Sequence, residues 1–146
     1  MTDIPHLAYG RHVLVDISET NAAVLNDGEA LVQALTCAAE SEGATVLGTI
    51  EHAFKPSGVT ILLLLAESHV SLHTYPEQGR AFFDAFTCGV RCEPMNIFRR
   101  FVEAHPVGAY RIVSCERGEA LRQSLDISRA SRPRVWTPLS ICGVHE

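Results

Sequence analysis

Serine, histidine and cysteine side chains that can act as nucleophiles, bases and acids are concentrated between residues 66 and 89. The segment reads AESHVSLHTYPEQG from Ala66 to Gly79, and FTCG follows from Phe86 to Gly89. The apolar run from Val59 to Leu65 that precedes it is typical of a buried strand. Reactive side chains at the end of a rigid strand are well placed for catalysis, so this segment is the candidate active site.

Taken alone, these residue types leave several readings open. Ser68 stands beside His69 and could be a hydrolase nucleophile, but the G-x-S-x-G turn that exposes such a serine is absent. His69 and His73 have the H-x3-H spacing of two zinc ligands on a helix. On a strand, at ~3.3 Å per residue, they would lie about 13 Å apart, too far to share one metal. The remaining reading is that they are half-buried strand residues satisfied by hydrogen bonds.

Composition and charge are those of a soluble globular domain, with 146 residues of which 47% are hydrophobic and 20% charged. The net charge of −5 argues against a nucleic-acid binder, and we interpret Arg129, Arg132 and Arg134 as a solvated tail. We expect no membrane contact, because no signal peptide and no apolar run of about 20 residues is visible. The five cysteines form no paired framework, which favours the reducing cytoplasm. Cys88 and Cys92 lack a second close pair, so we expect no metal.

Hydrophobic periodicity predicts the elements that must hold the reactive segment in place. Two-residue alternation predicts strands over residues 12–18, 44–54, 69–75 and 109–115. Apolar stripes predict one helix from the Asn26–Gly28 start to about Gly43 and a second over residues 94–105. The segment 81–88 suits either state. The run 59–66 is apolar on both faces, as expected of a central strand that is covered on both sides.

The order of these elements predicts an α+β fold, a two-layer sandwich of a mostly antiparallel sheet with helices on one face. The other face of such a sheet needs a cover. A second copy of the chain, stacked sheet on sheet, would supply it and give an αββα dimer. We expect residues 1–118 to form the domain and residues 119–146 a poorly ordered extension.

Seven short motifs resemble, in order, those of the prokaryotic S-adenosylmethionine decarboxylase proenzyme family, whose members depend on a pyruvoyl group. They are GRH at 10–12, GAT at 43–45, F-x-P-x-G-V at 54–59, ESH at 67–69, HT-x-PE at 73–77, FTCG at 86–89 and ERG at 116–118. The resemblance covers most of residues 9–118, which makes 1–118 the catalytic domain. It also favours a strand over 81–88.

By this resemblance, the chain cuts itself between Glu67 and Ser68. The Ser68 hydroxyl attacks the Glu67 carbonyl, elimination splits the resulting ester, and Ser68 becomes a pyruvoyl cofactor that forms a Schiff base with the substrate. The resemblance assigns proton transfer during processing to His73. Thr60, where the family usually has a serine, would assist it. Cys88 matches the residue that returns a proton to the substrate after carbon dioxide leaves.

The resemblance also implies a small amino-acid-type substrate, S-adenosylmethionine, and a role in supplying aminopropyl groups for spermidine and other polyamines. Phe54, Tyr75 and Glu77 match positions around the family's substrate site. Tyr75 replaces a tryptophan, Arg80 an aromatic residue and Ile61 a glycine, which keeps L-ornithine or L-arginine open as alternative substrates. A catalytically inactive assembly or regulatory subunit is the other alternative. The presence of Glu67, Ser68, His73 and Cys88 together speaks against it.

Overall fold

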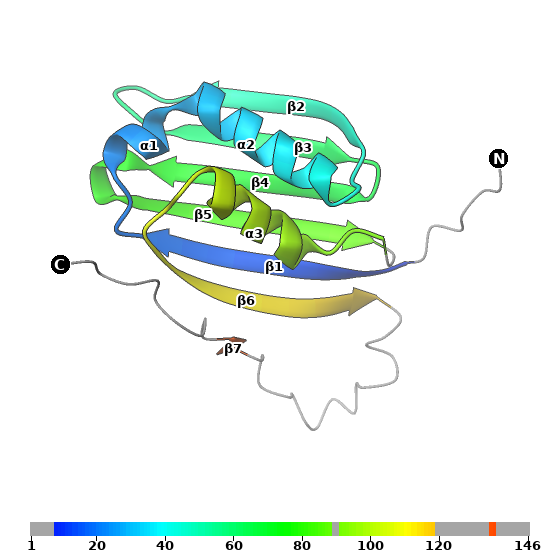
Figure 1. Ribbon diagram of the computed structural model, residues 1–146. Coiled ribbons are helices and arrows are strands. Elements are labelled where there is room, and N and C mark those ends of the chain that lie inside the picture. The colour runs from blue at the N-terminus through cyan, green and yellow to red at the C-terminus, as the bar shows by residue number, and fades with distance from the viewer. Residues whose placement is uncertain (1–7, 89–90, 119–134, 137–146) are drawn as a thin grey trace.

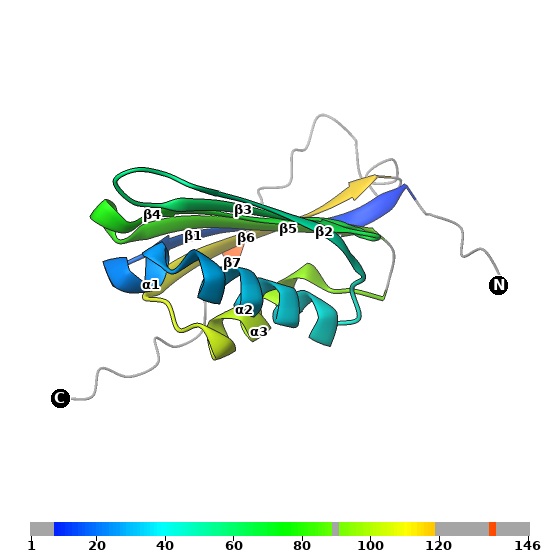
Figure 2. The same cartoon turned by 90° about the horizontal axis from the view of Figure 1, so that it is seen from above.

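A computed structural model describes residues 8–88, 91–118 and, for the backbone alone, 135–136. One sheet carries all the strands, and the helices lie together on one of its faces (Figures 1 and 2). The elements are β1 (Tyr9–Ser18), α1 (Ala22–Asn26), α2 (Gly28–Ser41), β2 (Val46–Ala53), β3 (Val59–Leu65), β4 (Ser68–Tyr75), the 3-10 turn η1 (Pro76–Gln78), β5 (Arg80–Cys88), α3 (Pro94–Ala104), β6 (Ala109–Gly118) and β7 (Val135–Trp136). The predicted two-layer α+β fold is confirmed.

The strand order is β2-β3-β4-β5-β1-β6-β7, and every neighbouring pair is antiparallel. The segment 81–88 is a strand, as the resemblance favoured, and short turns join β2 through β5 in chain order. The short helix α1 was not predicted. The prediction for residues 119–146 falls outside the described residues, except that the backbone of β7 pairs with β6.

Helix starts follow ordinary capping rules. The Asp27 side chain accepts a hydrogen bond from the Ala30 N–H at 3.1 Å and so begins α2 at the predicted place. Glu93 accepts from the Met95 N–H and Pro94 occupies the first turn of α3. None of the helices described is both long and apolar enough to cross a bilayer.

Aromatic packing ties α3 to the sheet. Phe83 of β5 is 2% exposed, and its ring centroid lies 5.1 Å from that of Phe98 and 6.1 Å from that of Phe101, both on α3. Aromatic pairs at these separations add to the free energy gained by burial. The helix layer is therefore anchored through the middle of β5.

We expect Phe83→Ala to lower the free energy of unfolding by about 3–5 kcal/mol, because the cavity left between β5 and α3 cannot close fully. Urea unfolding at fixed protein concentration measures the change. Phe83→Leu keeps most of the buried apolar volume and should lose less than about 1.5 kcal/mol. A Phe83→Ala chain that keeps the wild-type free energy of unfolding would contradict this placement of the core.

The sheet face away from the helices is open and partly apolar, and we call it the open face. Its middle row of cross-strand partners runs through Ile50, Leu62, Ser71, Asp84, Leu14 and Val113. Leu62 is 40% exposed and Leu64, two residues along β3, is 58% exposed. The expectation that β3 is covered on both faces is therefore not met within one chain, because the helices cover only one side.

Candidate active site

The register of the strands places the histidines of the open face in two separate rows. One row holds Leu64, His69, Phe86, His12 and Cys115. The other row holds His52, Thr60, His73, Phe82, Asp16 and Arg111. These rows lie toward opposite ends of β4, with the middle row between them.

The junction of Glu67 and Ser68 is a strained turn. Ala66 and Glu67 form the turn between β3 and β4, and Ser68 has a φ of 150°, which residues with a side chain rarely adopt. The Glu67 carbonyl accepts a hydrogen bond of 2.9 Å from the Cys88 N–H, and the Glu67 carboxylate accepts one of 3.0 Å from the Thr45 N–H. Strain of this kind is often stored at functional sites.

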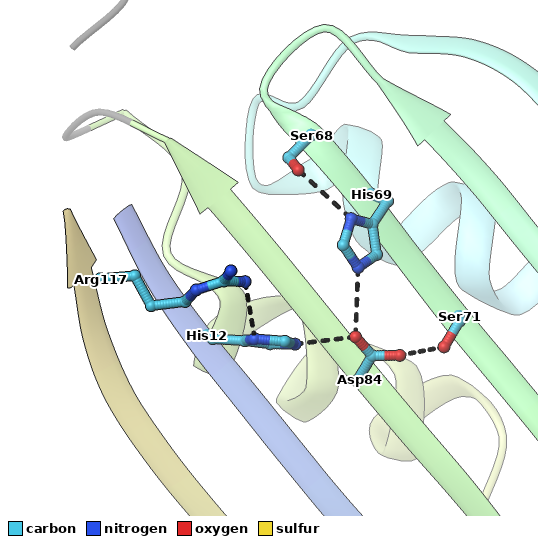
Figure 3. Close-up of polar contacts among 6 residues, drawn as sticks. All are labelled: His12, Ser68, His69, Ser71, Asp84 and Arg117. Atoms are coloured by element: carbon cyan, nitrogen blue, oxygen red, sulfur yellow. Dashed lines mark hydrogen bonds and ion pairs between the residues drawn. The ribbon is translucent and has the colours of Figure 1, made fainter. Parts of the chain in front are cut away.

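A chain of polar contacts leads from Ser68 into the sheet (Figure 3). Ser68 Oγ lies 3.2 Å from Nδ1 of His69, whose Nε2 lies 3.2 Å from Oδ2 of Asp84. The same Asp84 oxygen lies 2.8 Å from Nε2 of His12, while the Ser71 hydroxyl donates to Oδ1. The Asp84 carboxyl is thus surrounded by three hydrogen-bonding side chains. We call His12, His69, Ser71 and Asp84 the Asp84 cluster.

Asp84 is ionised in this setting. Burial opposes its charge and is the largest single effect, but the hydrogen bonds from Ser71, His12 and His69 together outweigh it and hold the pKa of Asp84 below its ordinary value. The side chain of Asp84 is 24% exposed, whereas that of His69 is 42% exposed. The Asp84 cluster therefore holds a fixed negative charge beside a more accessible imidazole.

A cavity lies at the other end of β4. Its volume is about 610 Å³, within the range usual for small-molecule sites. Its lining residues are Phe54, Lys55, Pro56, Ser57, Thr60, His73, Thr74, Tyr75 and Glu77. Within it the Thr60 hydroxyl lies 2.9 Å from Nδ1 of His73. The cavity thus contains all three residues predicted to bind substrate and the two predicted to assist processing.

The predicted site residues therefore form two groups. Glu67, Ser68 and Cys88 meet at one end of β4, whereas His73 and Thr60 lie with the cavity at the other end. Ser68 and His73 are five residues apart on one strand, which corresponds to about 17 Å. Within one chain, His73 cannot reach the Ser68 hydroxyl.

Burial separates the two cysteines of the C-x3-C pair. Cys92 is 3% exposed and lies in the hydrophobic core. Burial raises the pKa of the Cys92 thiol to about 11, so this side chain stays protonated. Cys88, in contrast, is half-buried at the end of β5, and its backbone N–H donates a hydrogen bond to the Glu67 carbonyl. Of the two thiols, Cys88 is the one available for chemistry.

Two-residue alternation over residues 69–75 predicts that His69 and Ser71 share one face. It identifies neither their common partner Asp84 nor His12, which also contacts Asp84. The tight connection from Tyr75 to Arg80 fixes the β4–β5 register and puts Asp84 directly across from Ser71. That partner could have been found by counting back from the turn. His12 carries no such local signal, because β1 reaches β5 only through the tertiary fold.

Comparison with known proteins places the chain in a family. The sequence model described as S-adenosylmethionine decarboxylase matches residues 11–118. The chain belongs to the S-adenosylmethionine decarboxylase family. This match contains most of β1 and the whole of β2 through β6, and hence both rows of histidines.

Individual relatives carry the same family name. The S-adenosylmethionine decarboxylase proenzyme of Brevibacillus brevis is 49% identical over 86 residues, which are 59% of this chain and 65% of that protein. The proenzyme of Prochlorococcus marinus is 48% identical over 85 residues, 58% of this chain and 68% of that protein. The crystal structure of the Aquifex aeolicus VF5 adenosylmethionine decarboxylase superposes with a TM-score of 0.70 at 28% identity, over 77% of this chain and 92% of that one. The match to the Brevibacillus protein thus spans just under two thirds of its length.

Proposed function

We propose that this chain is a cytoplasmic, self-cutting decarboxylase that acts on S-adenosylmethionine and supplies aminopropyl groups for polyamine synthesis. The observation that carries the proposal is the Glu67–Ser68 junction. There a strained serine with a hydrogen-bonded hydroxyl adjoins a carbonyl that already accepts an N–H bond. Family membership and the relatives named as proenzymes support the same conclusion.

Peptide cleavage by a serine makes two demands on the junction. A trans peptide bond is stable, so the hydroxyl must be held against the carbonyl and the developing oxyanion must be stabilised. The Cys88 N–H on the Glu67 oxygen provides one such donor. We expect scission between Glu67 and Ser68, which leaves Ser68 at the start of the second fragment.

The surroundings of Ser68 fit the pyruvoyl group that the family implies. That group supplies a ketone that accepts electrons as a carboxylate is lost. The position of Cys88 on the strand beside Ser68 supports a role for its thiol in delivering a proton to the substrate carbon. Ser68 pairs with Thr87, so Cys88 is the next residue along.

The cavity residues have the chemistry to bind the remainder of S-adenosylmethionine. Phe54 and Tyr75 are 51% and 41% exposed and can offer aromatic faces to the adenine ring and to the sulfonium charge. The Glu77 carboxylate, 3.5 Å from the Ser57 hydroxyl, can accept hydrogen bonds from ribose. The observations favour this nucleoside substrate over ornithine or arginine, which have no ring to stack.

A dimer resolves the separation of the two groups. Two open faces packed together bury the leucines of β3 and match the identical surfaces that a two-fold interface requires. If the two-fold axis lies between the sheets and runs across the strands, the Ser68 end of one protomer faces the cavity of its partner. Each complete site then combines Ser68 and Cys88 of one protomer with His73, Thr60 and the cavity of the other.

Mass and product analysis of purified protein test the proposal. We expect two fragments, residues 1–67 and 68–146, the second without an ordinary amino terminus. Carbon dioxide release is expected from S-adenosylmethionine and not from ornithine or arginine assayed in parallel. A single uncut chain with no turnover of any of the three would refute the proposal and favour an assembly subunit.

A further inference from the structure

We propose that His69 is the base that removes the Ser68 proton in the first step of self-cutting, and that Asp84 is the positioning residue that orients His69. This inference rests on the proposed self-cutting and names residues for a step that the motif resemblance leaves to His73. The contacts that carry it are Ser68 Oγ to His69 Nδ1 and His69 Nε2 to Asp84 Oδ2, each 3.2 Å long (Figure 3).

The hydrogen positions on His69 follow from its partners. An ionised carboxylate can only accept hydrogen bonds, so the His69 nitrogen that faces Asp84 carries the hydrogen. In the neutral ring Nδ1 is then bare and accepts from the Ser68 hydroxyl. This is the arrangement in which an imidazole acts as a base toward a serine while a carboxylate fixes its tautomer.

Asp84 is itself held in place from two other sides. The Ser71 hydroxyl donates to its second oxygen, and Nε2 of His12 lies 2.8 Å from the first. Arg117 lies 3.3 Å from Nδ1 of His12, and its guanidinium group can only donate. The hydrogen on neutral His12 is therefore on Nε2, where it points at Asp84.

The Asp84 cluster also has the spacing of a metal site, since one ligand atom from each of His12, His69 and Asp84 lies within 4.8 Å of the others. A metal needs bare nitrogens directed at it. For His12 this would move the ring hydrogen to Nδ1, against the always positive Arg117. The observations therefore favour a proton relay over a metal ion.

The proposed step balances within the chain. The Ser68 proton passes to Nδ1 of His69 while Oγ bonds to the Glu67 carbonyl carbon, and the Cys88 N–H stabilises the charge on the oxygen. The bond from that carbon to the Ser68 nitrogen then breaks, and the nitrogen takes the proton from His69. The product is an ester between Glu67 and Ser68 with a free amine, and His69 returns to its starting state.

Fresh protein made by cell-free translation allows the scission rate to be followed on denaturing gels. We expect His69→Gln to slow scission by about 100-fold or more and Asp84→Asn by about 10-fold or more, since a positioned base contributes factors of this order. His105→Gln and Asp27→Asn make the same exchanges on the helix side, where Asn caps α2 as well as Asp does, and should cut at the normal rate.

Hydroxylamine identifies the blocked step, because it splits esters and spares amides. Uncut His69→Gln chain is expected to resist hydroxylamine, since its Glu67–Ser68 amide has not been converted. Cleavage at that junction by hydroxylamine would overturn the inference, because it would place His69 after ester formation. Scission of His69→Gln at the normal rate would also overturn it, and since the wild-type chain would still be cut, the proposed function would stand.

Chemical rescue separates a base from a structural residue. Added imidazole is expected to restore scission to His69→Ala at least 10-fold and to have no effect on Ser68→Ala. Failure of rescue in a His69→Ala chain whose circular dichroism spectrum matches that of Ser68→Ala would count against the base. Wild-type scission that stops with a metal chelator and returns with zinc would favour a metal in the Asp84 cluster and overturn the relay.

Discussion

Ser68→Ala is expected to remain a single 146-residue chain and to lose turnover by at least roughly 10³-fold. In the proposed reaction, removing the hydroxyl removes both the nucleophile that attacks the Glu67 carbonyl and the oxygen that must leave in the elimination before a ketone can form. The fold should survive, because the Ser68 side chain makes only one hydrogen bond among the described residues, to His69. Intact mass and carbon dioxide release measure the two losses on one preparation.

Ser41→Ala is the matched control for this variant. Ser41 lies at the end of α2, where its hydroxyl bonds the Ala38 carbonyl at 2.9 Å, on the side of the sheet away from the site. It should be cut and active. Turnover by an uncut Ser68→Ala chain would show that no ketone derived from residue 68 is needed.

Two variants that are each nearly inactive are expected to restore activity when they are produced together. Glu77→Ala alters the cavity at one end of β4. Cys88→Ala removes the proposed proton donor beside the other end and is expected to leave Ser68 able to cut. In a mixed dimer one site receives both defects and the other receives neither. Random pairing of equal amounts should therefore recover about one quarter of the wild-type activity.

The control combines Cys88→Ala with Ser68→Ala. Both changes lie at the same end of β4, so every site of the mixed dimer keeps one defect and no recovery is expected. Double affinity tags isolate the mixed dimers, and the isolated Glu77→Ala/Cys88→Ala dimers should have about one half of the wild-type activity, because one of their two sites is intact. An inactive Glu77→Ala/Cys88→Ala mixed dimer would show that sites are not shared between protomers in the way proposed.

Most of the sheet could be predicted because its strands alternate cleanly. Val13, Val15 and Ile17 of β1 face the helices and are at most 2% exposed, as their two-residue spacing predicted. The segment 81–88 was ambiguous because Phe82, Phe83 and Phe86 fit either period. The segment is a strand because it pairs with both β1 and β4. The pairing with β1 joins residues far apart in the chain, so local sequence cannot predict it.

The site was harder to predict than the fold, because motifs name residues but not their distances. The ESH and HT-x-PE motifs are close in sequence, yet Ser68 and His73 lie toward opposite ends of the extended strand β4. The relay from His69 to Asp84 depends on cross-strand register, and the contact with His12 depends on where β1 enters the sheet. Short motifs contain neither piece of information.

The structure shows which of the residues that differ from the family's usual sequence line the cavity and which do not. Ile61, which stands at a glycine position, is 0% exposed and faces the helices, so it affects packing and not substrate. Tyr75 lines the cavity and is the substitution that can change substrate contacts. Arg80 lies outside that cavity, beside Asp16 and Arg111 in a second, smaller hollow.

The strand order has a consequence for the two fragments that the proposed cut would leave. β1, β2 and β3 belong to the first fragment and β4, β5 and β6 to the second, yet β1 lies between β5 and β6. The two polypeptides would thus be interleaved. Ser68 would stay paired with Thr87, and Leu65, just before the cut, would stay in the pairing of β2 with β3. Separation would require the whole sheet to open. Once opened, reassembly becomes a second-order reaction between two chains, so mature protein should recover poorly from denaturation at high dilution.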